Sequence, residues 1–174
     1  MDYYFLFVQG LDIVAWLFIL FSYYRKNTNK ILVFQIIATS FFILHYYLLG
    51  AYSGVFICLL EEIRDYLYYK TDKDKYLFFG SIPFVIGIGM LSYHNLFDLF
   101  PIFSTLIDGC SLTYGKRVVL FGSIVSYSLW VIYDFCVLSY TGMITDFLVV
   151  LSNIGILIYE ISKSLFSKKK CHKG

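Results

Sequence analysis

Long apolar runs, each followed by a short polar or basic stretch, dominate this sequence. The first covers residues 3–24 and ends at a basic segment that begins with Arg25. A helix needs about 20 apolar residues to cross a bilayer, so this run is long enough to span one. Similar runs follow at 31–49, 53–69, 76–93, 118–137 and 141–161. The sequence therefore predicts an all-α integral membrane protein.

The composition supports lipid as the solvent of this chain. Hydrophobic residues make up 59% of the 174 residues and charged residues 15%, against about 45–50% and about 25% in soluble domains. A soluble domain of this length buries only about 70% of its surface, which would leave much of this apolar material in water. The net charge of +2 is too small to indicate a nucleic-acid partner. The expected partner is the lipid bilayer.

The positive charges decide how many times the chain crosses. The segment 96–114 could be a span or a surface segment. If it spans, all 14 Lys and Arg residues fall on one side or in the half of a span nearest that side. Basic residues gather on the cytoplasmic side of inner-membrane proteins. This favours seven transmembrane helices, with the N-terminus outside and the C-terminus in the cytoplasm. No basic segment or cleavage site marks a signal peptide, so we expect the first run to be retained.

An internal repeat divides the chain. Residues 45–54 (HYYLLGAYSG) match residues 133–142 (YDFCVLSYTG) at a shift of 88 positions. An odd linker helix makes two three-helix units run in the same direction, which gives a parallel repeat about an axis along the membrane normal. Chance similarity between two turns is the alternative. The prediction is a 3+1+3 layout. It has a first bundle at 1–75, a linker helix at 76–95, a second bundle at 96–163 and a basic cytoplasmic tail at 164–174.

Short motifs in this chain resemble those of the YgjV-type bacterial inner-membrane protein family. They lie at residues 9–15, 45–50, 63–64, 100–102, 130–132, 134–135 and 151–153. Together they extend over most of residues 9–160, in the family's order. The resemblance implies a multi-pass protein of the bacterial cytoplasmic (inner) membrane. It implies no activity, because the family has none assigned.

The 3+1+3 layout is more distantly similar to SWEET sugar carriers and PnuC-type carriers. In SWEET carriers an asparagine on the third helix of each bundle lines the substrate pocket. The matching positions here are Asn153 and Asp65, and the aspartate is a departure from that pattern. Pro101 resembles the hinge proline of a SWEET bundle, whereas residues 3–24 contain none. The resemblance implies a carrier but leaves the solute open.

Polar residues inside the apolar runs are the candidate site. An ionised Asp at the centre of a bilayer costs about 2.5–3.5 kcal/mol, so these residues should face the helix bundle or a wet cavity. The candidate substrate-binding residues are Asp12, Trp16, Asp65, Asp108, Trp130 and Asn153. Neutral hydrogen-bonded carboxyls, helix-helix bonding and simple indole packing are the alternatives. Glu61 and Arg64 form a candidate structural ion pair or gate.

Two further groups of polar residues have simpler interpretations. Asp134 and Asp146 lie near the outer ends of their runs, where we expect interfacial solvation. His45, beside the outer turn, is expected to be a hydrogen-bonded interface residue rather than a proton relay. The four cysteines show no CxxC spacing and indicate neither a disulfide framework nor a zinc site.

Enzymatic activity is not expected. The sequence contains no HExxH, GxSxG or P-loop motif, and in segment 106–109 Asp108 is not preceded by the glycines of the GxGD motif of an intramembrane aspartyl protease. No cofactor or metal is implied. Two functions remain. One is a carrier for a polar or cationic solute with a flat apolar face, such as a nucleoside-like metabolite. The other is a non-transporting interaction or regulatory protein. A midplane cavity favours the first and a solid core the second, and an oligomer is compatible with both.

Overall fold

The computed structural model describes residues 3–23, 28–71, 74–111 and 116–171, and at some helical positions, Asp65 among them, only the backbone. In these residues the secondary structure is entirely helical. The elements are α1 (Tyr3–Tyr23), α2 (Thr28–Leu49), α3 (Tyr52–Thr71), α4 (Asp74–Leu91), the 3-10 turn η1 (Leu96–Asp98), α5 (Leu99–Ser111), α6 (Lys116–Cys136) and α7 (Tyr140–Cys171). The predicted all-α fold class is confirmed.

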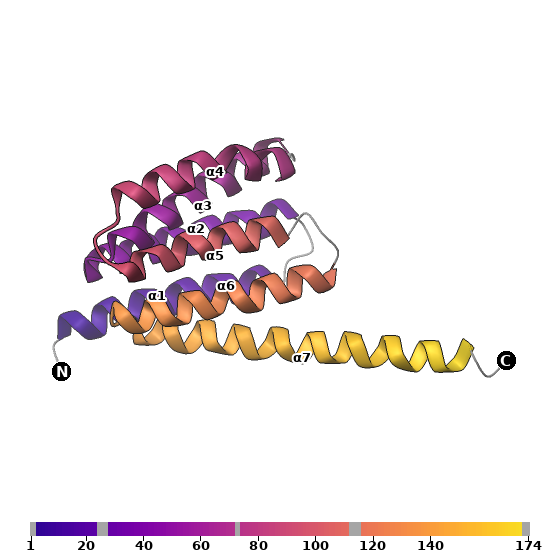
Figure 1. The fold of residues 1–174 in the computed structure, drawn as a ribbon. Coiled ribbons are helices and arrows are strands. Elements are labelled where there is room, and N and C mark those ends of the chain that lie inside the picture. The colour runs from indigo at the N-terminus through magenta and orange to yellow at the C-terminus, as the bar shows by residue number, and fades with distance from the viewer. Residues whose placement is uncertain (1–2, 24–27, 72–73, 112–115, 172–174) are drawn as a thin grey trace.

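Six of the helices close into a ring. Neighbours in the sequence pack against one another from α1 to α3 and from α5 to α7, while α3 packs on α5 and α7 packs on α1. Helix α4 packs on α3 and α5 and lies at the edge of the molecule (Figure 1). Helices α1, α3, α5 and α7 run one way, and α2, α4 and α6 run the other way. The ring therefore encloses a space to which six helices each present a face.

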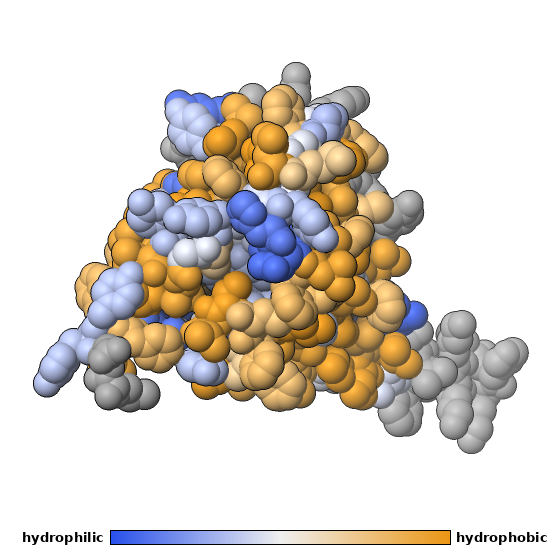
Figure 2. All heavy atoms as spheres, turned by 60° about the vertical axis from the view of Figure 1, so that its left-hand side comes forward, coloured by the Kyte–Doolittle hydropathy of each residue, from blue (hydrophilic) through white to orange (hydrophobic). Residues whose placement is uncertain are grey.

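The surface is apolar and the interior is partly polar. Met90 is 78% exposed and Phe84 64% exposed, whereas Asp12 is 1% exposed and His45 is fully buried. Figure 2 shows one face of the molecule, which is largely apolar and carries a compact group of hydrophilic residues. This distribution reverses that of a soluble protein, since lipid tails solvate apolar side chains and polar ones turn inward.

Within the described ranges, three segments are long and apolar enough to cross a membrane: Tyr3–Ser22, Arg117–Cys136 and Tyr140–Lys163. Val33–Leu49 and Phe79–Leu91 are apolar but shorter. Helix α3 carries Glu61, Glu62 and Arg64, and α5 has only 13 residues. The chain thus has membrane-type helices, as the apolar runs predicted.

Two helix bounds differ from those predicted. Helix α5 begins at Leu99 rather than at residue 96, because residues 96–98 form the 3-10 turn η1, whose start Asp98 caps by accepting hydrogen bonds from the backbone N–H groups of His94 (2.9 Å) and Asn95 (2.8 Å). Helix α7 continues to Cys171 instead of ending near residue 161. The intervening segment contains no Gly or Pro, and lysine is a good helix former, so nothing there stops the helix.

The α2–α3 and α6–α7 turns share one backbone geometry. Gly50 and Leu138 both adopt the left-handed conformation, with φ of 74° and 62°. The next N–H in each turn, from Ala51 or Ser139, bonds back to the carbonyl of Tyr46 or Asp134 at 2.9 Å. This is the bond pattern of a Schellman-type helix end. Both hairpins therefore reverse the chain tightly at the same end of the molecule (Figure 1).

Candidate functional site

A cavity of about 270 Å³ lies inside the helix ring. All six ring helices contribute to its wall, and none of its lining residues comes from α4. On α1 the lining residues are Asp12, Trp16 and Ile19, at the spacing of one helix face. On α2 they are Gln35, Thr39, Phe42 and Tyr46, with the same periodicity. The ring thus turns one polar and aromatic face of each helix toward a common space.

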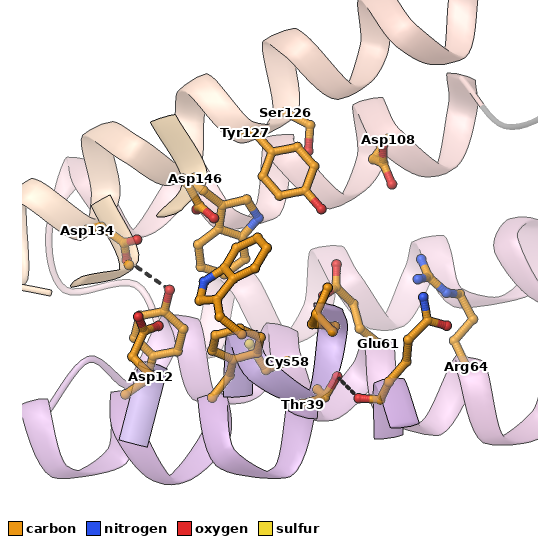
Figure 3. A pocket seen from close by; sticks show the side chains of 17 residues that line it. Asp12, Thr39, Cys58, Glu61, Arg64, Asp108, Ser126, Tyr127, Asp134 and Asp146 are labelled. Carbon is orange, nitrogen blue, oxygen red and sulfur yellow. Dashed lines mark hydrogen bonds between the residues drawn. The ribbon is translucent and has the colours of Figure 1, made fainter. Parts of the chain in front are cut away.

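One end of the cavity is acidic. Asp12, Asp134 and Asp146 line it, and their side chains are 1%, 0% and 7% exposed. The Tyr46 hydroxyl donates a hydrogen bond of 2.8 Å to Asp134 Oδ1. Both carboxyl oxygens of Asp12, and Oδ2 of Asp134, lack a hydrogen-bond partner among the described residues. Figure 3 shows Asp12 and Asp134 at the same end. Buried acceptors without donors are destabilising, so this end has capacity for a donor.

Aromatic rings form the wall next to these carboxyls. Tyr46 stacks on Trp130 with ring centroids 5.7 Å apart and an interplanar angle of 24°. Trp16 meets Phe42 edge to face, with centroids 6.1 Å apart. All four residues line the cavity. Flat apolar walls of this kind accept a ring or an alkyl body, and their π faces attract cations.

The other end of the cavity has mixed charge. Glu61, Arg64 and Asp108 line it (Figure 3). Thr105 Oγ1 donates to Glu61 Oε1 at 3.0 Å, and Ser123 Oγ donates to Asp108 Oδ1 at 3.1 Å. These bonds tie α3 to α5 and α5 to α6. The acidic groups at this end are therefore held by hydroxyl donors, in contrast to Asp12.

A layer of hydrogen bonds between the two halves of the chain lies beside the acidic end. His45 Nδ1 lies 2.8 Å from the Val8 carbonyl, and Nε2 lies 2.8 Å from Ser139 Oγ. Because a carbonyl can only accept, Nδ1 carries the proton and Nε2 accepts from the Ser139 hydroxyl. The expected hydrogen-bonded histidine is confirmed, although it is buried in the interior rather than at an interface.

Tyr133 forms the opposite part of this layer. Its hydroxyl oxygen accepts from the Gly54 N–H at 2.9 Å, lies 2.8 Å from Ser53 Oγ, and donates to the Ala51 carbonyl at 3.3 Å. The Tyr133 side chain is fully buried. It therefore anchors α6 to the turn between α2 and α3.

Two clasps close the same end of the ring. Gln9 donates from Nε2 to the Leu138 carbonyl at 3.0 Å, and its Oε1 accepts from the Thr141 N–H at 3.0 Å. Ser53 Oγ donates to Asp98 Oδ1 at 2.7 Å. The first clasp joins α1 to α7, and the second joins α3 to the turn before α5. Each clasp thus joins the first half of the chain to the second at this end of the ring.

The structure brings most of the sequence-predicted candidates together. Asp12, Trp16, Asp108 and Trp130 line the cavity, as do Glu61 and Arg64. Asn153 is partly buried but is not among the lining residues. The Asp65 side chain lies outside the described residues. The roles of these residues in binding, and the ion pair between Glu61 and Arg64, stay predictions.

Asp134 and Asp146 correct the sequence analysis. Both were expected to be solvated at the interface, but both are buried in the cavity wall. The cause is the tight turns, which bring the ends of α6 and α7 under the layer formed by His45 and Tyr133. Sequence reasoning also missed Tyr46. Its spacing from Thr39 and Phe42 on one helix face is a signal that could have found it.

A metal centre is not indicated. In the described ranges, no group of three or more His, Cys, Asp or Glu side chains is placed to hold a metal ion. Cys58 lines the cavity as a free thiol. The chemistry that this arrangement supports is binding by carboxylates, hydroxyls and aromatic faces.

Comparison with known proteins decides the family. A family model described as a bacterial inner membrane protein, Imp-YgjV, matches residues 6–164. The chain belongs to the YgjV family of inner membrane proteins. Inner membrane protein YgjV of Escherichia coli (strain K12) is 24% identical over 131 residues, which cover 73% of this chain and 69% of that protein. No solved structure matches the chain significantly. Family membership confirms the resemblance carried by the short motifs, and it gives the location as the bacterial inner membrane.

Proposed function

We propose that this member of the YgjV family is a carrier that moves a small polar solute across the inner membrane by alternating access. The observation that supports this most is the cavity of about 270 Å³, because polar and aromatic side chains from helices of both halves of the chain line it. Ligand cavities are commonly a few hundred Å³ and combine apolar walls with a few placed polar groups. A scaffold protein with a solid core would need no such space.

Hydrogen bonds between equivalent positions support a 3+1+3 repeat. Tyr46 and Asp134 are 88 positions apart and bond to each other. His45 reaches Ser139 in the second turn, and its counterpart Tyr133 reaches Ala51 in the first turn. His45 and Tyr133 thus each contact the tight turn of the opposite half of the chain. Reciprocal contacts of this kind are expected around a two-fold axis between two similar bundles.

The clasps and the ring order agree with the same symmetry. Ser53 and Thr141 are equivalent in the repeat, and each bonds to the helix or turn that starts the opposite half. The ring order α1, α2, α3, α5, α6, α7 is unchanged when the two halves are exchanged. Helix α4 then acts as the linker, which is consistent with its absence from the cavity wall.

A seven-span orientation follows from the charges. Lys30, Lys70 and Arg117 stand at helix ends on the side opposite the two tight turns. We propose that this side is cytoplasmic, that the turns face outward, and that the N-terminus is outside. The layer of hydrogen bonds beside Asp12 then closes the outer end of the cavity. Alternating access would open this layer by rocking one bundle against the other.

A non-transporting interaction or regulatory protein is the alternative function. It is disfavoured by the polar cavity, since buried carboxyls without partners would destabilise a protein that binds nothing there. We propose transport rather than catalysis, because no catalytic motif accompanies the cavity.

The test measures solute flux through a protein whose α1–α7 clasp can be locked by a disulfide bond. Purified protein is reconstituted in liposomes, and uptake is measured across a panel of radiolabelled polar metabolites against empty liposomes. In a background with the native cysteines replaced, Gln9→Cys and Thr141→Cys place two thiols at the α1–α7 clasp. Oxidation should stop flux, and reduction should restore it, because the outer layer can no longer separate.

Controls keep this result interpretable. The Glu62→Cys and Thr141→Cys pair places the thiols on helices that are not clasped, so oxidation should leave flux unchanged. Labelling of single cysteines from each side reports orientation: a thiol beside Arg117 should react from the cytoplasm. Absence of flux for the whole panel in folded protein, or full flux through the oxidised clasp, would reject alternating access and favour the interaction protein.

A further inference from the structure

The acidic end of the cavity holds more acceptors than donors. Three buried carboxyl oxygens, two from Asp12 and one from Asp134, have no hydrogen-bond partner in the described part of the chain. Asp146 lines the same cavity as Asp12 and Asp134 (Figure 3). Hydroxyl donors bond to Asp108 and Glu61, whereas the Thr141 hydroxyl, the one near Asp12, donates to Gln9 Oε1 at 2.8 Å. This end therefore has the composition of a site for a donor that the chain does not supply.

The cavity is built to admit positive charge. Among the lining residues, five are acidic (Asp12, Glu61, Asp108, Asp134 and Asp146) and one, Arg64, is basic. Arg64 lies at the opposite end from Asp12 (Figure 3). Gly142 lies in the wall beside Asp134, and a Cβ there would come within 2.5 Å of Asp134 Oδ2. Gly142 therefore packs directly against the unpartnered oxygen, and a side chain at this position would displace it.

We propose that this end binds an organic primary ammonium group, with the cationic nitrogen among Asp12, Asp134 and Asp146 and the apolar body of the solute between Trp16 and Trp130. A primary ammonium has three N–H donors, which equals the number of unpartnered oxygens. The stacked Tyr46 and Trp130 rings provide π faces to a neighbouring cation. The proposal names the substrate class of the proposed carrier. Transport of the amine rests on that proposed function, whereas binding of the amine does not.

An inorganic cation explains the wall less well. A bare metal ion makes no use of the aromatic rings that line the cavity next to the carboxyls. A cavity of about 270 Å³ also exceeds the needs of an ion and suits a small amine. Inorganic cations are therefore an outcome for the experiment to exclude.

Ligand-dependent thermal stability of the purified protein in detergent tests the binding step. The probes are benzylamine, the uncharged benzyl alcohol, the quaternary benzyltrimethylammonium, Na⁺ and Mg²⁺. A ligand that binds only the folded protein raises its Tm by mass action. We expect benzylamine to raise the Tm, the quaternary ion to raise it less, and the alcohol and the inorganic cations to leave it unchanged.

Substitutions of the carboxyl residues test whether benzylamine binds at the acidic end of the cavity. Asp12→Asn and Asp134→Asn should each weaken benzylamine binding by at least about tenfold, since each replaces a charged hydrogen-bond acceptor with a neutral one. Glu62→Gln is the matched control: it removes one carboxylate that bonds to Ser40 and does not line the cavity, and should bind benzylamine like the wild type. Without ligand, Asp12→Asn should be at least as stable as the wild type, which separates loss of binding from loss of folding.

Each result decides between outcomes. Equal stabilisation by benzylamine and benzyl alcohol, unaltered amine binding in both Asn variants, or stabilisation by Na⁺ or Mg²⁺ in place of the amine would overturn the ammonium site. Binding of benzylamine with no uptake of radiolabelled benzylamine into liposomes would uphold the site and reject the carrier. Flux of neutral or anionic solutes that amines do not inhibit, and that Asp12→Asn leaves intact, would uphold the carrier and reject this site.

Discussion

The α2–α3 and α6–α7 hairpins share one backbone geometry but present different side chains to the cavity. Both turn on a residue with left-handed φ and both repeat the same backbone hydrogen bond. In the first hairpin Tyr46 lines the cavity and Gly54 packs against the Tyr46 ring; in the second hairpin Asp134 and Gly142 both line the cavity. A phenol therefore stands where the other half has a carboxylate. The shared backbone sets the geometry, and the side chains that differ between the halves make one end of the cavity acidic.

The largest effect is expected from removing the side chain that locks the two hairpins. Tyr133→Ala should lower the free energy of unfolding by about 3–5 kcal/mol, because a fully buried aromatic ring is replaced by a void. Tyr133→Phe keeps the ring and loses only its hydroxyl bonds, which are worth about 0.6–1.7 kcal/mol in a membrane protein. Unfolding of the purified protein in mixed detergent and SDS measures both.

Tyr159→Ala is the control for that series. Tyr159 is 64% exposed on α7, so its removal should change stability by less than about 0.5 kcal/mol. If Tyr133→Ala were no more destabilising than Tyr159→Ala, the layer between the hairpins would not hold the halves together, and the comparison would lose its structural basis.

The membrane class, the family and the candidate residues Asp12, Trp16, Asp108 and Trp130 came from local patterns. Apolar run length and the energetic cost of a carboxyl in lipid act residue by residue, so a sequence displays them directly. The burial of Asp134 and Asp146 does not follow from such patterns. It depends on His45 and Tyr133 closing over them from the other half of the chain. Contacts between positions 80 or more apart are set by packing, which one sequence does not reveal.

The paired glycines should separate the stability of the hairpins from their chemistry. A Cβ at Gly142 would meet Asp134 Oδ2 and Ser139 Oγ at 2.5 Å, whereas one at Gly54 would meet Tyr133 Oη and Tyr46 Cγ at 3.0 Å. Both alanine variants should lose about 1–3 kcal/mol of stability from overpacking, with Gly142→Ala the larger loss. Only Gly142→Ala should also abolish stabilisation by benzylamine, because it displaces the carboxyl.

Thermal unfolding with and without benzylamine tests this pair, with Gly155→Ala as the control, since a Cβ at Gly155 meets nothing within 4 Å. Loss of amine binding in Gly54→Ala to the same degree as in Gly142→Ala would show that the two hairpins contribute equally to the site. The proposed chemical difference between the two hairpins would then be rejected.

A double-mutant cycle measures how strongly the hydrogen bond between Tyr46 and Asp134 joins the two hairpins. Tyr46→Phe removes the donor of the 2.8 Å bond, and Asp134→Asn changes its acceptor. We expect a coupling energy of about 0.6–1.7 kcal/mol, the range for interhelical hydrogen bonds in membranes. The cycle is measured by unfolding of the two single variants and the double variant. Additive effects of the two substitutions would mean that the bond does not contribute to joining the hairpins.

The smallest effect is expected at Asn153. The repeat makes this residue the equivalent of Asp65, and resemblance to SWEET carriers makes it a candidate for binding, yet it does not line the cavity. Asn153→Leu should therefore change the apparent affinity for benzylamine by less than about twofold, below the tenfold that corresponds to 1.4 kcal/mol. Asp12→Asn, measured in parallel, provides the large effect for scale. A loss of uptake in Asn153→Leu with unchanged binding would place this residue in a second conformation of the carrier, in which α7 turns a different face inward. A loss of binding itself would mean that the solute site extends along α7 toward the basic side, and that the acidic end beneath the two hairpins is only part of it.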